Sequence, residues 1–81
     1  MHGRARPKPT QQPASQVRHE ALFVSALQPS DAPSADVITK AITAAMRRFG
    51  QRGCAARMAQ EFGDHPEAAA ARMRWARQLA A

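Results

Sequence analysis

The segment that follows Ser34 constrains the fold most, because its apolar residues recur at the spacing of a helix. At about 100° per residue, the apolar side chains fill one half of the helical wheel and the polar side chains fill the other. The apolar set is Val37, Ile38, Ala41, Ile42, Ala45, Met46 and Phe49. Ser34 is a good N-cap, Asp36 complements the helix dipole in the first turn, and Gly50 provides a C-terminal stop. We therefore predict a core helix from Ser34 to Gly50.

Three further segments carry helical signals. Residues 17–28 follow helical spacing up to Pro29; a strand remains open over 22–27, but a single strand would have no evident partner. Gly53 opens a short helix over 54–62 that closes at Gly63. A last helix begins at Asp64, where Asp64-His-Pro-Glu67 has the form of a capping box, and runs to the C-terminus.

These patterns define the predicted fold class and domain organisation. We expect an all-α, compact three- to four-helix domain over residues 17–81. Residues 1–16 are rich in proline and glutamine and offer almost no apolar surface, so we expect a disordered basic N-terminal tail there.

The charge of the chain favours a polyanionic partner. It contains 12 Lys and Arg against 6 Asp and Glu, a net charge of +6, with a pI near 11.4. Arginine supplies nearly all of this excess, and guanidinium groups suit the recognition of phosphate and guanine. The alternative is a basic surface that serves only solubility. In the tail, Arg4, Arg6 and Lys8 either contact DNA as a flexible arm or belong to an inert segment.

Several classes of protein are disfavoured by the residue inventory. The single cysteine, Cys54, excludes an intramolecular disulfide, and the three histidines lack metal-binding spacing. The longest near-apolar run, Ala21 to Leu27, is too short to cross a bilayer. No set of catalytic residues stands out. We expect a cytoplasmic protein that is not an enzyme, that binds no cofactor and no metal, and that does not associate with a membrane.

The segment from Cys54 to Trp75 resembles a helix-turn-helix. Ala59 matches the small residue at the helix crossing, and Gly63 matches the glycine four positions later, where the turn takes a positive φ. Met58 and Phe62 match the apolar positions of the first helix. Asp64 and Arg72 depart from this pattern, because each stands where an apolar residue is usual. The charge of Arg72 requires either pairing with Glu61 or Asp64, or an extended side chain that passes Trp75 to reach the surface or a phosphate.

The resemblance assigns roles to the faces of the last helix. Its core-facing arc consists of Ala69, Met73, Trp75, Ala76, Leu79 and Ala80. Candidate base contacts on the recognition helix are His65, Glu67, Ala70, Ala71, Arg74 and Gln78. Candidate phosphate contacts are Arg47, Arg48, Arg52, Arg57 and Arg77. The alternative for the outer face of this helix is an ordinary solvated surface.

Composition, length and the basic tail resemble small transcriptional repressors of actinobacterial conjugative plasmids, of the kil-override type. The resemblance implies a sequence-specific regulator of transcription that represses by occupying an operator on double-stranded DNA near a promoter. A homodimer is expected, because palindromic operators are read by two-fold dimers. Its surface would be residues 17–28, with Leu22, Phe23 and Leu27. The alternative function is a small helical interaction protein that docks on a larger partner without binding DNA.

Overall fold

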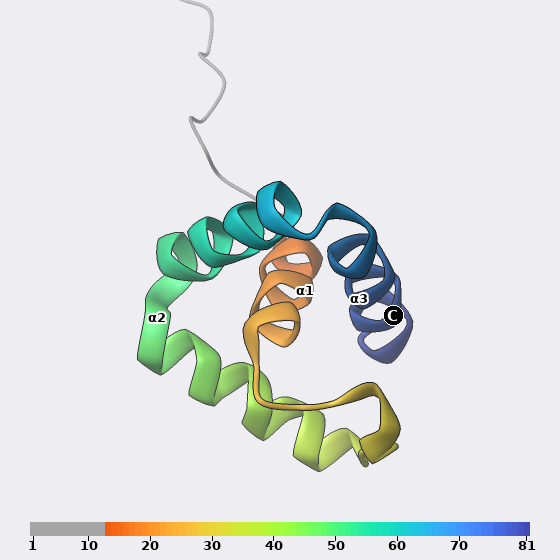
Figure 1. Cartoon of the computed structure of the whole chain (residues 1–81). Helices are drawn as coiled ribbons and strands as arrows, with labels where there is room; N and C mark the ends of the chain where they lie inside the picture. The colour runs from red at the N-terminus through yellow and green to blue at the C-terminus, as the bar shows by residue number, and fades with distance from the viewer. Residues whose placement is uncertain (1–12) are drawn as a thin grey trace, which may run out of the picture.

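The computed structural model describes residues 13–81, which form three α-helices and one short 3₁₀ turn. Helix α1 spans Ala14–Val24, the 3₁₀ turn η1 spans Pro29–Asp31, α2 spans Ala35–Asp64 and α3 spans Pro66–Leu79. No strand occurs in the described residues. The two halves of α2 and the length of α3 surround α1, which lies at the centre of the molecule (Figure 1). The predicted all-α fold is confirmed.

Helix α1 settles the ambiguity of residues 17–28 and moves both boundaries. The helix begins at Ala14, so the last residues of the predicted tail belong to the domain. It ends at Val24 rather than at Pro29, because the backbone adopts an extended conformation at Ser25. The Ser25 hydroxyl donates to the Leu22 carbonyl over 2.7 Å and accepts from the Leu27 amide over 3.3 Å. These local bonds compete with the helical pattern and stop the helix before the proline.

Helix α2 begins as predicted and contains a sharp bend. The Ser34 hydroxyl accepts a hydrogen bond from the Val37 amide over 3.3 Å, which confirms the N-cap. Lys40 and Asp36 form the expected ion pair at 3.2 Å on the exposed side. Gly50 has φ +70° and ψ 171°, a conformation outside the helical region that glycine adopts without a Cβ clash. The predicted stop at Gly50 is thus a bend, and helix resumes directly after it.

The junction between α2 and α3 lies two residues later than predicted. Gly63 is helical and has no positive φ, so the prediction of a turn at Gly63 is wrong. The chain turns at His65, which has φ −140° and ψ 68°. A residue that precedes proline is driven out of the helical region by the proline ring, so Pro66 sets the turn and then occupies the first position of α3.

The capping box predicted at Asp64 is also absent. His65 is the N-cap residue of α3, and no side chain caps that end of the helix. Asp64 is the last residue of α2, one position too early to accept from the first amides of α3. A capping box instead lies at the N-terminus of η1, where the backbone amide of Gln28 donates to the Asp31 carboxylate over 2.7 Å.

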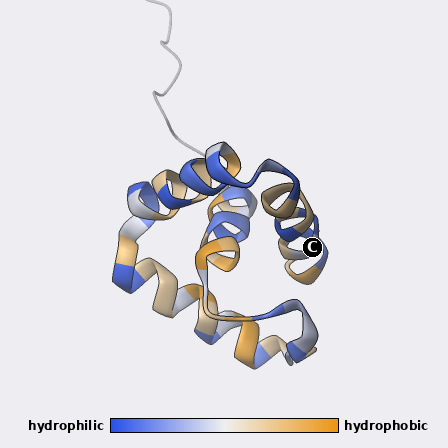
Figure 2. Ribbon diagram, viewed as in Figure 1, coloured by the Kyte–Doolittle hydropathy of each residue, from blue (hydrophilic) through white to orange (hydrophobic). Residues whose placement is uncertain are grey.

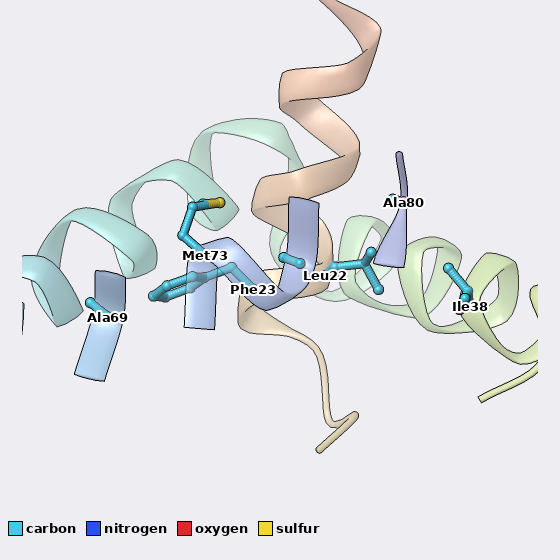
Figure 3. Packing of buried hydrophobic residues seen from close by; sticks show 7 residues of the cluster. Leu22, Phe23, Ile38, Ala69, Met73 and Ala80 are labelled. Carbon is cyan, nitrogen blue, oxygen red and sulfur yellow. The ribbon is translucent and has the colours of Figure 1, made fainter. Parts of the chain in front are cut away.

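The main core joins α1 and α3 to the beginning of α2. Its buried residues are Leu22, Phe23, Ile38, Ala69, Met73, Ala76 and Ala80, most of which are labelled in Figure 3. The alanines of α3 allow that helix to approach α1 closely, and the predicted core arc of α3 is confirmed. Leu22 is fully buried and Phe23 is 3% exposed. The predicted dimer surface on residues 17–28 is therefore wrong, because the domain buries these two side chains in its own core.

Candidate nucleic-acid interface

Basic residues concentrate around the bend of α2. Residues 13–81 carry nine Lys and Arg against six Asp and Glu, a net charge of +3. Between Asp36 and Glu61, however, the chain contains five basic residues and no carboxylate. Four of these are arginines that flank Gly50, and all four are exposed; they are Arg47, Arg48, Arg52 and Arg57. Figure 2 shows hydrophilic residues on both sides of the bend. We refer to these four residues as the bend arginines.

Phe49 organises two of the bend arginines. The Cζ atom of Arg57 lies 4.2 Å from the centroid of the Phe49 ring, and that of Arg48 lies 5.3 Å from it. Both distances are within the range in which the negative face of an aromatic ring attracts a cation. Arg57 reaches this ring because the bend at Gly50 changes the direction of α2. The absence of a Cβ at Gly53 lets the backbone after the bend lie close to Phe49, since a Cβ there would lie 3.0 Å from the Cβ of Phe49.

The outward face of α3 has a mixed electrostatic character. Most of the predicted base-contacting residues are exposed: His65, Glu67, Ala71, Arg74 and Gln78, with Ala70 half-buried. Arg77, the predicted phosphate contact of this helix, is exposed as well. Three exposed carboxylates lie at or near its N-terminal end, on Glu61, Asp64 and Glu67. Their charge repels phosphate, so the basic part of this face is its second half, at Arg74 and Arg77.

The close helix crossing predicted at Ala59 does not occur. Ala59 is exposed, and Phe62, predicted as an apolar position of the motif, is 36% exposed. The Phe62 ring stacks on Phe23 at 5.8 Å between centroids, and Met58 is half-buried against the main core. Helix α3 makes its alanine-lined contact through Ala69 and Ala76 instead.

Arg72 has a structural role that its sequence context does not reveal. Its Nε donates to the Phe23 carbonyl over 2.5 Å, and its Nη2 donates to the carbonyls of Ser25 and Leu27 over 3.1 and 2.8 Å. The guanidinium also lies 4.6 Å from the ring of Trp75. The predicted pairing with Glu61 or Asp64 is wrong, because the nearest acceptors are the carbonyls at and beyond the end of α1. Burial lowers the pKa of the Arg72 guanidinium, which nevertheless stays charged at neutral pH.

A second buried group lies between α1 and α2. Cys54 is 1% exposed, and its Sγ donates to the Ala45 carbonyl over 3.8 Å. Glu20 is 2% exposed and accepts from the Gln16 amide nitrogen over 2.9 Å. Burial, reinforced by the charge of Glu20, raises the pKa of the Cys54 thiol. A raised pKa keeps this thiol protonated and unreactive, so it behaves as a small core residue.

Three further findings delimit the site. In the part of the chain that the structure describes, no group of three or more His, Cys, Asp or Glu side chains is placed to hold a metal ion. None of the helices at residues 13–81 is both long and apolar enough for a transmembrane span. The predicted tail contacts Arg4, Arg6 and Lys8 lie outside the described residues.

Comparison with known proteins found no family model, no curated protein and no solved structure that matches the chain.

Proposed function

We propose that the protein binds double-stranded DNA, with the bend arginines on the phosphate backbone, and that it acts as a repressor of transcription. The observation that carries this proposal is the carboxylate-free stretch between Asp36 and Glu61, whose four arginines are exposed around one bend. Guanidinium groups that lack a carboxylate partner are free to bind phosphate. We assign recognition of the DNA base sequence to the second half of α3, where Arg74 is exposed.

The test compares two pairs of charge-removing substitutions. One variant removes two bend arginines, Arg47→Gln with Arg52→Gln, and the matched control removes two from α3, Arg74→Gln with Arg77→Gln. Binding to a fluorescent duplex is measured by anisotropy across a salt series. If each bend arginine neutralises one phosphate, the four together contribute about −3.6 to the log–log slope of affinity against salt. The bend variant should reduce the magnitude of that slope by about 1.8.

The control variant separates backbone binding from base reading. Duplexes selected from a random pool by the wild type define its preferred sequence, and recovery of a palindrome indicates that two copies bind together. The α3 variant should lose the preference for that sequence, and the magnitude of its salt slope should fall by no more than about 0.9, the share expected for Arg77. If neither variant alters the affinity or the salt slope, the assignment of this interface is wrong.

One observation favours a second candidate function, a small helical protein that docks on an apolar face of a larger partner without binding DNA. An open groove of about 340 Å³ lies between the segment after α1 and the first half of α2. Its lining is mainly apolar, with Leu27, Ala41 and Phe49 among its residues and Arg48 as its charged member. Association through such a groove depends weakly on salt, because apolar contact dominates it. A partner that binds with a flat salt response, together with absence of duplex binding, would favour this function.

A further inference from the structure

We propose that Phe49 is a positioning residue of this interface, which holds Arg48 and Arg57 for the backbone of duplex DNA. The inference rests on the proposed function and specifies its partner, since it assigns the ring to the two guanidinium groups rather than to bases. The core holds the ring in place, the two arginines are exposed, and the bend at Gly50 brings Arg57 to the ring.

The ring is held in place by the core. Phe49 is half-buried and packs against the cluster of Ala21, Ala45 and Cys54, all of which are buried. Interiors of this kind are close-packed, so a ring held against them keeps one orientation. The exposed part of Phe49 is therefore a fixed support for side chains that would otherwise move freely in solvent.

The two arginines depend on that support. Both are exposed, and neither forms an ion pair with a carboxylate in residues 13–81. An exposed arginine samples many rotamers, and ordering it upon binding reduces affinity. Contact with the ring, at 4.2 Å for Arg57 and 5.3 Å for Arg48, restricts that motion before DNA arrives. The guanidinium edges remain free to donate hydrogen bonds to phosphate oxygens.

The same contacts determine which nucleic acid fits. Proteins that bind single strands offer bare aromatic faces on which bases stack. Two guanidinium groups lie over the Phe49 ring, and the ring also packs against the core, so it offers no bare face of this kind. The surface therefore offers positive charges around a bend, two of them ordered by the ring, which suits contact with phosphates better than the stacking of bases.

The experiment compares three aromatic variants with the wild type. Phe49→Leu keeps apolar packing and removes the ring, and Phe49→Tyr keeps a ring. Phe62→Leu removes a ring that stacks on Phe23 rather than on an arginine. Each is measured against a labelled duplex and against one of its strands alone, across a salt series. Circular dichroism during thermal unfolding confirms that each variant is folded.

The expected results separate ordering from charge. Phe49→Leu should bind the duplex about three- to tenfold more weakly with an unchanged salt slope, because it keeps every charge. Phe49→Tyr and Phe62→Leu should bind as the wild type does. Arg57→Ala, as the charge reference, should lower the slope by about 0.9. The wild type should bind the single strand no more tightly than the duplex.

Four results would overturn the inference, and they can be distinguished from failure of the proposed function. Duplex binding that Phe49→Leu leaves unchanged, or that Phe49→Tyr loses while folded, removes the role of the ring. A reduced salt slope in Phe49→Leu shows that charge contacts, rather than ordering, were lost. Tighter single-strand binding that depends on Phe49 shows that the ring stacks on bases. Absence of any duplex binding by the wild type overturns the proposed function itself.

Discussion

Replacement of Arg72 by methionine tests the contact that ties α3 to the end of α1. Methionine retains an unbranched stem of similar length beside Trp75 but donates no hydrogen bond. The substitution removes the bonds to the carbonyls of Phe23, Ser25 and Leu27 and the contact with the Trp75 ring. These carbonyls lie at or beyond the end of α1, and in the variant each loses the donor that the Arg72 side chain supplies.

The magnitude follows from the number and type of these bonds. A hydrogen bond that involves a charged group contributes about 1.5–3 kcal/mol, and a cation–π contact adds about 0.5–2 kcal/mol. Arg72 is half-buried, and water replaces part of the lost bonding, so the contributions do not add in full. We expect a loss of about 2–4 kcal/mol. A domain of the size of residues 13–81 has a free energy of unfolding of about 3–10 kcal/mol, so the loss is a large fraction of its stability.

The assay is urea unfolding followed by circular dichroism and by the fluorescence of Trp75, the only tryptophan in the chain. In thermal unfolding of the same variant, the melting temperature should fall by roughly 10–30 °C. Arg74→Met, on the same helix and exposed, is the control and should leave the midpoint unchanged. Arg72→Lys should lie between the two, because lysine keeps the charge without the planar fork of donors. A loss below about 0.5 kcal/mol for Arg72→Met would show that these hydrogen bonds do not hold α3 to the end of α1.

Two further predictions address the backbone and the buried thiol. Gly50→Ala should destabilise the domain by about 1–3 kcal/mol, because φ +70° with ψ 171° is a backbone conformation that is essentially restricted to glycine. Gly63→Ala, in helical backbone with open space for a Cβ, should stabilise the domain by about 0.5–1 kcal/mol. Thermal unfolding measures both, and a loss of stability in Gly63→Ala would contradict the helical conformation of Gly63. The pKa of Cys54 is raised by folding, so unfolded chains release the thiol proton first, and stability should fall as pH rises above about 8.5. Denaturant unfolding from pH 7 to 10 should show this fall in the wild type, and the chain has no tyrosine to add a competing titration. Cys54→Ala should show a smaller fall, and an equal one would exclude the thiol as its source.

Local patterns predicted several features that the structure confirms. The N-cap at Ser34, the ion pair of Asp36 with Lys40 and the core face of α3 each depend on residues a few positions apart. Interactions at that range are set by helix geometry alone, so the sequence suffices to identify them. The exposure of the bend arginines follows in the same way, since a charge without a partner stays in water.

Residue patterns alone thus suffice for the helical class, the faces of the helices and the concentration of arginine around Gly50. Which segments meet depends on the packing of the whole domain. Arg72 binds carbonyls 45 to 49 residues earlier in the chain, and Leu22 and Phe23 fill the core of the domain rather than a dimer surface. That packing also decided between Gly63 and Pro66 as the origin of the turn, and it brought Arg57 onto Phe49. The physical reason is the range of the interactions, because hydrogen bonds and packing between distant segments leave no period in the sequence.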